Sequence, residues 1–256
     1  PRISFNERGE CNACSWAEKK KKINWNKREI ELKDLLDKHR SKNGDFDCLV
    51  PVSGGKDGSY VAYNLKHKFG MNPLCLTVTP PLPTKLGEQN LRNFVESGYS
   101  HISVNPPFEA MRKMNKKGFI EMGFPYYGWL TAILSIPVRI AYQFNIGITF
   151  YGEDGEVEYG GASETEKEPI FDSIYMRKIY LESGYEKVID DLDISKKDSI
   201  FFKFTDQNLL NKKSIKFTHW SYFENWDPYR NYLTAKEKYN LQDVSSNNEG
   251  TFTNFA

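Results

Sequence analysis

Short apolar runs alternate with segments of helical spacing over the first 150 residues of this chain. Residues 48–52 form an almost continuous apolar run, which is typical of a strand buried on both faces of a parallel sheet. Helical spacing follows over residues 60–68, and Gly70 provides a C-terminal stop. The same alternation predicts three further strands, at 73–79, 100–104 and 147–151, and helices at 86–97, 107–117 and 129–144.

Strands that alternate with helices predict the fold class, an α/β protein with a doubly wound parallel sheet. In such sheets the ligand binds at the carboxyl ends of the strands. Four segments of the chain follow predicted strand ends and are therefore candidate site segments: 53–59, 77–81, 105–107 and 152–161.

Three regions are expected along the chain. Residues 1–42 are a cysteine-containing lead followed by a charged amphipathic helix at 16–40, whose expected buried positions are Ile23, Ile30, Leu32, Leu35 and Leu36. Residues 43–165 hold the predicted sheet. Residues 166–256 form a mostly helical, aromatic-rich extension, with helices at 169–183 and 185–192. The run of lysines at 19–22 is interpreted as the solvated face of the first helix, with RNA binding as the alternative.

Residues 53–59 read Ser-Gly-Gly-Lys-Asp-Gly-Ser and turn from a strand into a helix. A helix N-terminus offers unpaired N–H groups and a partial positive charge, which suit phosphate. Gly54 and Gly55 let backbone approach a ligand, and Lys56 adds a charge. The segment therefore predicts a phosphate loop rather than a plain strand-to-helix turn. Neither the Walker A pattern nor the dinucleotide pattern G-x-G-x-x-G is present.

A second informative segment follows the strand predicted at 147–151. It carries four carboxylates, Glu153, Asp154, Glu156 and Glu158, and ends in Gly160 and Gly161. One interpretation is an acidic surface loop. The other is that some of these carboxylates hold Mg²⁺ on a phosphate, or orient a substrate or ammonia, because Mg²⁺ commonly takes one or two carboxylates together with phosphate oxygens.

The composition of the chain argues against several classes of protein. The 256 residues carry 35 basic and 34 acidic side chains, which argues against a strongly basic nucleic-acid binder. There is no apolar run of the roughly 18 residues that a membrane span needs, and no signal peptide opens the sequence. Four cysteines do not indicate a disulfide framework in a chain of this length. We expect a cytoplasmic protein without a membrane partner, and further residues beyond both ends.

The segment SGGKDGS resembles the S-G-G-x-D-S loop of the N-type (PP-loop) ATP pyrophosphatases, which cleave ATP between the α- and β-phosphates and form an adenylated intermediate. Gly58 stands between Asp57 and Ser59, where the commonest form has Asp-Ser directly. The resemblance implies that ATP is bound by the loop, with two threonines on the adenine and ribose side: Ser53, Gly54, Gly55, Lys56, Asp57, Gly58 and Ser59, with Thr77 and Thr79.

Four segments in order, RISFNERGECNAC, VSGGKDGSY, YGEDGEVEYGG and WDPYRNY, are together similar to the N-acetyl sugar amidotransferases. These enzymes act in bacterial surface-polysaccharide (lipopolysaccharide O-antigen) and nonulosonic-acid (pseudaminic and legionaminic acid) pathways. The resemblance implies conversion of a sugar acetamido group into an acetamidino group with ATP and ammonia. It also implies a glutaminase subunit that supplies the ammonia and a cyclase-like subunit that conducts it, with no nucleic-acid partner.

The resemblance also assigns site residues. The catalytic set is Lys56, Asp57, Glu153 and Glu158, with Asp57 and Glu153 on Mg²⁺; helix capping is the alternative role for Asp57 and Ser59. The substrate set is Tyr159, Gly160, Gly161, Trp226, Asp227 and Arg230. Cys11 and Cys14 form half of a tetrahedral, structural zinc site. Family members carry a second pair upstream, whereas Cys48 and Cys75 are expected in the core.

Two other functions stay open. A tRNA-thiolating pyrophosphatase joins the same loop to C-x-x-C pairs, but it needs a basic groove or a catalytic cysteine near the site, and the sequence indicates neither. A nucleotide-binding module without activity has less need of Lys56 and of the acidic segment.

Overall fold

The computed structural model describes residues 3–182 and 184–244, and its centre is one six-stranded sheet. The strand order is β3-β2-β1-β4-β6-β5, and every neighbouring pair is parallel except β5 with β6. The predicted α/β fold with a mostly parallel sheet is therefore confirmed. The strands are β1 (Cys48–Pro51), β2 (Pro73–Val78), β3 (Ser100–Val104), β4 (Ile148–Tyr151), β5 (Ile170–Phe171) and β6 (Lys216–His219).

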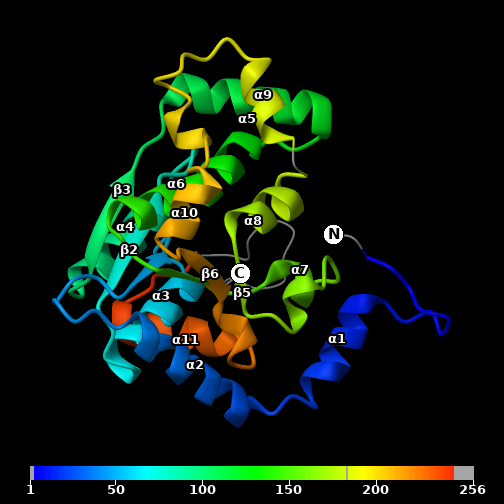
Figure 1. Cartoon of the computed structure of the whole chain (residues 1–256), viewed down its shortest axis with the longest axis vertical. Coiled ribbons are helices and arrows are strands. Elements are labelled where there is room, and N and C mark those ends of the chain that lie inside the picture. Colours follow the sequence, from blue (N-terminus) through cyan, green and yellow to red (C-terminus); the bar gives the residue numbers. More distant parts are fainter. Residues whose placement is uncertain (1–2, 183, 245–256) are drawn as a thin grey trace.

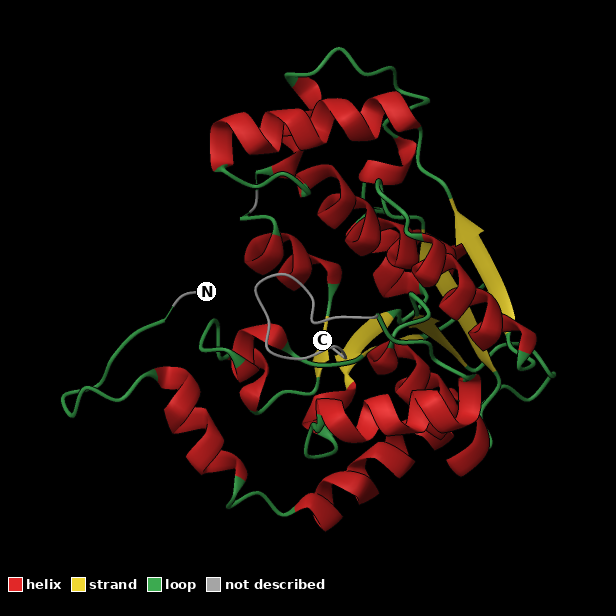
Figure 2. Cartoon of the chain, turned by 180° about the vertical axis from the view of Figure 1, so that it is seen from behind, coloured by secondary structure: helices red, strands yellow, loops and turns green. Residues whose placement is uncertain are grey.

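Helices cover both faces of this sheet (Figure 1, Figure 2). Alternate strand residues face two separate cores, so that Leu49 points to one and Val50 to the other. The first core is covered by α5 (Phe108–Met122), α6 (Tyr127–Gln143), α8 (Ser173–Tyr180) and α9 (Tyr185–Asp190). The second is covered by α2 (Trp25–His39), α3 (Lys56–Tyr63), α4 (Lys85–Glu96) and α11 (Pro228–Tyr239).

The N-terminal region differs from the single helix predicted at 16–40. It forms α1 (Asn12–Lys20) and α2, separated by a turn. Asn24 explains the break, because its side chain accepts a hydrogen bond from the Lys27 N–H and so starts a new helix. Within α2, Leu32 and Leu36 are buried as expected, whereas Ile30 lies off this stripe and is 59% exposed.

The C-terminal region also differs from the prediction. Instead of a helix at 169–183, a two-residue strand (β5) precedes α8, which is capped by Asp172. Residues Lys216–His219 form β6, which was not predicted, and β6 inserts between β4 and β5. The sheet thus continues past residue 165. The remaining elements are α7 (Gly155–Glu158), α10 (Gln207–Lys212), a π-helical turn at Asn64–Lys68, and 3-10 turns at Glu164–Glu166, Ile200–Phe202 and Trp220–Tyr222.

Among the described residues, no helix has both the length and the apolar character that crossing a bilayer requires.

Candidate functional site

The phosphate-loop segment lies where β1 ends and α3 begins. Gly54 has φ +81°, and a Cβ atom there would lie 2.3 Å from the backbone nitrogen of Leu91 on α4. A Cβ atom on Gly58 would lie 2.8 Å from the carbonyl oxygen of Pro51. These two glycines are therefore required by the close packing of the loop against α4 and of α3 against the end of β1.

The N-terminus of α3 is left open by this loop. The helix begins at Lys56, and its N-cap residue is Gly55, which offers no side-chain acceptor. Neither Asp57 nor Ser59 caps the helix, in contrast to the alternative considered above. The Ser53 hydroxyl accepts a hydrogen bond from the Gly55 N–H at 3.3 Å. The first N–H groups of α3 consequently remain available to an anion.

Lys56 and Asp57 form a charged pair that a distant residue holds in place. The Lys56 Nζ lies 3.0 Å from Asp57 Oδ2, and Asn231 Nδ2 donates to Asp57 Oδ1 at 3.1 Å. Asn231 is fully buried on α11, which packs against α3. Sequence reasoning missed Asn231, although it lies in the segment WDPYRNY that the resemblance had singled out.

Glu153 joins this pair from the carboxyl end of β4. A Cβ atom on the preceding Gly152 would lie 3.5 Å from the Cβ of Asp57. Burial raises the pKa of Glu153, and the negative charge of Asp57 raises it further, while the Tyr159 hydroxyl donates to Oε2 at 2.9 Å and opposes the shift. Two carboxylates thus lie beside the open helix end. They fit the usual Mg²⁺ arrangement, in which phosphate oxygens complete the coordination.

The other carboxylates of the acidic segment hold the segment itself. Glu158, expected in the catalytic set, forms an ion pair with Lys20 of α1 and is only 9% exposed. Asp154 caps α7, contacts the Thr165 hydroxyl and lies 3.5 Å from His219 Nδ1. These contacts tie the segment to the N-terminal helix on one side and to the end of β6 on the other. They also show that the lysines at 19–22 are not all solvated.

Gly160 and Gly161 were expected to make room for a substrate, but contacts within the protein already require glycine at both positions. A Cβ atom on Gly160, whose φ is +82°, would lie 2.5 Å from Asn12 Oδ1. On Gly161 it would lie 2.0 Å from Glu156 Oε2. The neighbouring Tyr159 is 54% exposed, and its hydroxyl binds Glu153.

A cavity of about 660 Å³ opens beside the phosphate loop, between α4 and the ends of β2 and β3. Ser53, Thr77 and Thr79, all expected to bind ATP, line this one cavity. The Thr77 hydroxyl donates to the Val52 carbonyl at 2.7 Å and lies 2.8 Å from His101 Nε2. Burial lowers the pKa of His101, which favours the neutral imidazole. The volume falls in the range of about 300–1,000 Å³ that is usual for small-molecule sites.

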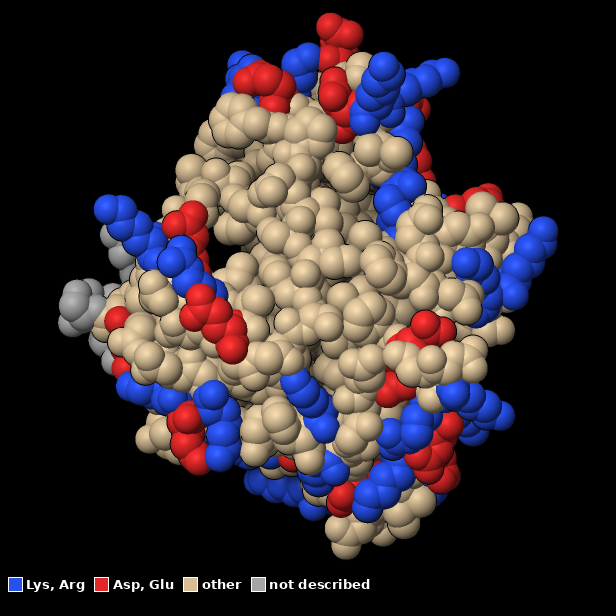
Figure 3. Space-filling view, turned by 90° about the vertical axis from the view of Figure 1, so that its left-hand side faces the viewer, with Lys and Arg blue, Asp and Glu red and all other residues tan. Residues whose placement is uncertain are grey.

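The molecular face over β3 and α4 is broad and largely uncharged (Figure 3). Lys and Arg side chains of the described residues stand mainly at its margins rather than in a continuous basic strip. This face therefore lacks the electrostatic footprint of a surface that binds a phosphate backbone.

Four other predicted site residues are either buried or engaged by neighbouring protein groups. Ser59 is 1% exposed, and its hydroxyl has no partner within the described ranges. Trp226 is buried against Tyr60, and Asp227 caps α11. Arg230 lies 3.2 Å from Glu224 and stacks over the Tyr60 ring at 4.6 Å. Trp226 and Arg230 thus pack against Tyr60 of α3, and Asp227 starts α11; their expected contact with a substrate stays a prediction.

The cysteines form two separate groups. Cys11 caps α1, its Sγ accepting from the Cys14 N–H at 3.3 Å, while Cys48 and Cys75 are buried. Across residues 3–182 and 184–244, no group of three or more His, Cys, Asp or Glu side chains could hold a metal ion. Cys11 and Cys14 would supply two of the four ligands of the expected zinc site, whose second pair was expected upstream of Pro1.

Comparison with known proteins gives limited matches. No family model matches the chain. A curated relative, an uncharacterized protein of Methanocaldococcus jannaschii, is 33% identical over 70 residues, which are 27% of this chain and 25% of that protein. The match thus spans about a quarter of the relative's length.

Two solved structures are also similar to parts of the chain. A U34-tRNA thiolase, NcsA from Methanococcus maripaludis with its [4Fe-4S] cluster, has a TM-score of 0.43 and 14% identity, covering 89% of this chain and 69% of that one. A predicted subunit of tRNA methyltransferase from Methanocaldococcus jannaschii has a TM-score of 0.36 and 17% identity, covering 74% and 75%. Because both scores are low, the fold assignment rests on the sheet topology described above.

Proposed function

We propose that the chain is an ATP pyrophosphatase of the PP-loop type, which transfers AMP to an acceptor oxygen and releases pyrophosphate. One observation carries the proposal: the uncapped N-terminus of α3, with Lys56 in its first turn, adjoins the cavity of about 660 Å³ through Ser53. Such an arrangement suits a nucleoside triphosphate, with its phosphates on the helix N-terminus and its nucleoside in the cavity.

The proposed transfer of AMP requires stabilisation of negative charge on the phosphates of ATP. The acceptor oxygen attacks the α-phosphorus, and the bond to the β-phosphate oxygen breaks. Lys56 and the free N–H groups of α3 stabilise the charge on the phosphates, and Asn231 keeps Asp57 oriented beside them. Mg²⁺, when held by Asp57 and Glu153, would supply further charge neutralisation on the phosphate oxygens.

For the acceptor, we infer the acetamido oxygen of an N-acetylated sugar. Its attack on ATP gives an O-adenylyl imidate and pyrophosphate; ammonia then displaces AMP and leaves an acetamidine. In this proposal ammonia comes from a glutaminase partner through a cyclase-like subunit. Two contacts between motif segments that are distant in the sequence support the view that these segments belong to one site. Asn12 binds the Gly160 carbonyl at 2.7 Å, and Asn231 binds Asp57.

A second candidate is tRNA thiolation on the same ATP site. The observation in its favour is that Cys11 and the exposed Cys14 lie at the start of α1, and α1 packs against α7 of the acidic segment. Thiols near an adenylating site are suited to sulfur transfer.

The two candidates are separated by one assay of AMP and pyrophosphate formation. The purified chain is given MgATP with N-acetylated sugars and an ammonium salt, or with tRNA and a sulfide source. We expect AMP formation with a sugar and ammonium, and an amidine product 1 mass unit lighter than the sugar acceptor, because NH replaces O. AMP formation that depends on tRNA and not on any sugar would favour thiolation. Absence of ATP binding would overturn both.

A further inference from the structure

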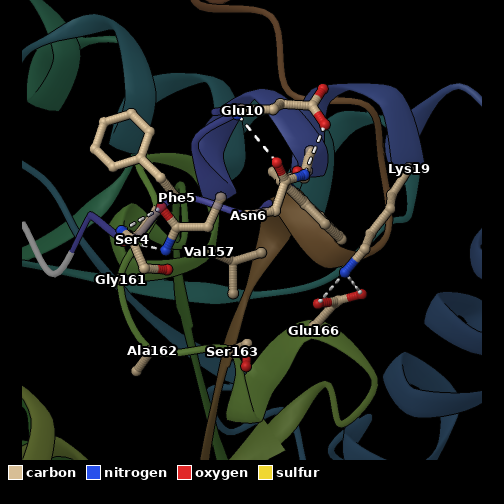
Figure 4. A pocket seen from close by; sticks show the side chains of 14 residues that line it. Ser4, Phe5, Asn6, Glu10, Lys19, Val157, Gly161, Ala162, Ser163 and Glu166 are labelled. Carbon is tan, nitrogen blue, oxygen red and sulfur yellow. Dashed lines mark hydrogen bonds and ion pairs between the residues drawn. The ribbon is translucent and has the colours of Figure 1, made fainter. Parts of the chain in front are cut away.

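A second cavity, of about 440 Å³, lies between the N-terminal lead and the end of the acidic segment. Figure 4 shows Phe5 and Asn6 of the lead on one side, and Gly161, Ala162 and Ser163 across from them. It is separate from the cavity beside the phosphate loop, and the two share no lining residue. None of the steps described so far uses it.

Specific contacts build this cavity. The side-chain amide of Asn12 donates to the Gly160 carbonyl at 2.7 Å, and its oxygen accepts from the Ser4 N–H at 3.2 Å. At the rim, Lys19 Nζ lies 3.1 Å from Glu166 Oε1, an ion pair that joins α1 to the segment after α7 (Figure 4). Asn12 thus fastens the N-terminal region to the acidic segment, and Lys19 fastens it to the 3-10 turn at Glu164–Glu166 that follows.

The acidic segment connects this cavity to the phosphate site. Gly160 and Gly161 line the cavity, and the adjacent Tyr159 donates to Glu153, whose carboxylate is influenced by the charges of Asp57 and Lys56. The segment that lines this cavity at Gly160 and Gly161 thus also carries Glu153 of the phosphate site.

The side chains that line this second cavity favour one class of ligand. Its neutral polar groups are hydroxyls and amides, such as Ser15, Ser163 and Asn6. Its basic side chain, Lys19, is neutralised by Glu166, and Glu10 adds a further carboxylate. A polyanion such as an RNA backbone finds no unpaired cation in this lining, whereas a neutral ligand with hydroxyl and amide groups finds donors and acceptors.

Aromatic side chains complete the lining. Phe5 is 70% exposed at the cavity, and Trp16 is 7% exposed in its wall. The Trp16 Nε1–H has no acceptor within the part of the chain that the structure describes. Apolar rings together with a few polar groups are usual in sites that bind small molecules, and the volume lies in the range of about 300–1,000 Å³ for such sites.

We propose that this cavity binds the sugar ring of the acceptor, so that the lead and the acidic segment together form the acceptor site. This inference rests on the proposed function, since that function requires a sugar acceptor.

The test measures sugar binding directly, by saturation-transfer NMR with N-acetyl-D-glucosamine as the probe. D-glucosamine, without the acetyl group, and a short RNA hairpin are the comparison ligands. We expect binding of the N-acetylated sugar, and about 10-fold weaker binding in Phe5→Ala, as the loss of one aromatic contact implies. Phe108→Ala is the matched control, because Phe108 is 69% exposed and lines neither cavity. It should bind like the unaltered chain.

A second variant, Ser163→Trp, fills the cavity and should abolish sugar binding, while binding of α,β-methylene-ATP stays unchanged. Sugar binding that is unaffected by both variants, an absence of sugar binding, or preferential binding of the RNA hairpin would each overturn the assignment of this cavity. Failure of the proposed function looks different: the sugar binds and Phe5→Ala weakens it, but the sugar does not stimulate AMP formation.

Discussion

Asn231 Nδ2 donates a hydrogen bond to Asp57 Oδ1 at 3.1 Å, across 174 residues of sequence. Asn231 is fully buried on α11, and Asp57 is the second residue of α3. This hydrogen bond leaves Oδ2 of Asp57 paired with Lys56. The last long helix of the described chain therefore sets the orientation of a carboxylate in the phosphate loop.

Asn231→Ala should impair catalysis without loss of folding. We expect AMP formation to fall by about 10- to 100-fold, or the Mg²⁺ requirement to rise by a similar factor, as is usual when the partner of a metal-binding carboxylate is lost. The isosteric Asn231→Asp should be at least as poor, because it places a second carboxylate beside Asp57. Asn208→Ala, on α10, is the control, and Mg²⁺ titrations of AMP formation provide the measurement. Full activity of Asn231→Asp would contradict the positioning role.

Lys56→Ala tests the phosphate loop itself. Lys56 supplies the side-chain cation in the first turn of α3, so its removal should lower AMP formation about 10²-fold or more, as does loss of one charge-stabilising group. Lys187→Ala, on the surface of α9, should leave the rate unchanged. Pyrophosphate release is measured for both variants. Turnover close to that of the unaltered chain in Lys56→Ala would refute the phosphate-loop assignment.

The ion pair between Lys20 and Glu158 should stabilise the fold. Both side chains are largely buried, at 19% and 9% exposure. Lys20→Met would leave the Glu158 carboxylate without its partner, and we expect the free energy of unfolding to drop by up to about 3 kcal/mol. Lys21→Met removes an exposed pair with Glu18 and should cost less than about 1 kcal/mol. Urea unfolding measures the free energy of unfolding of both variants. An equal loss in the two variants would contradict a stabilising role for the Lys20–Glu158 pair.

Thiol alkylation should distinguish Cys11, Cys14 and the two buried cysteines, Cys48 and Cys75. Hydrogen bonds from Cys14 lower the pKa of Cys11, whereas the bond from Cys14 to Cys11 raises the pKa of Cys14. Because the thiolate is the reactive form, Cys11 should be alkylated at lower pH than Cys14. Burial raises the pKa of Cys75 to about 12 and also raises that of Cys48, so both should react only after unfolding. Mass spectrometry after iodoacetamide treatment at a series of pH values reads each site, and labelling of Cys48 in the native chain would contradict the structure.

The sequence predicted those parts of the fold that have a local signal. Strands β1, β2, β3 and β4 were found near their observed positions, because short apolar runs bounded by helical segments mark them. Strand β6 was missed because Lys216 and Thr218 interrupt its apolar pattern and an aromatic segment follows directly. The break after α1 did have a signal, since Asn24 is a strong helix cap, but continuous charge and apolar spacing on both sides concealed it.

For the candidate site, too, the sequence indicated only those residues that have a local signal. Ser53 of the loop, Thr77 of β2 and Thr79 just after it line one cavity, and the sequence indicated that they follow neighbouring strand ends because strands have a local signal. The contacts Asn231–Asp57 and Lys20–Glu158 join residues more than 130 positions apart, so no local pattern reports them. Trp226 and Arg230 were expected to face a ligand because aromatic and charged side chains also occur at binding surfaces, yet here they pack α11 onto α3.

The position of β6 has a consequence for synthesis on the ribosome. Strand β6 pairs with β4 but begins 65 residues after β4 ends. At about 5–20 residues per second, translation of that interval takes roughly 3–13 s. Throughout this time one edge of β4 has no neighbour in the nascent chain, and such an open edge is a template for pairing with other chains. The emerging protein therefore passes through an interval in which it is vulnerable to misassociation, and that interval ends only when residues 216–219 emerge.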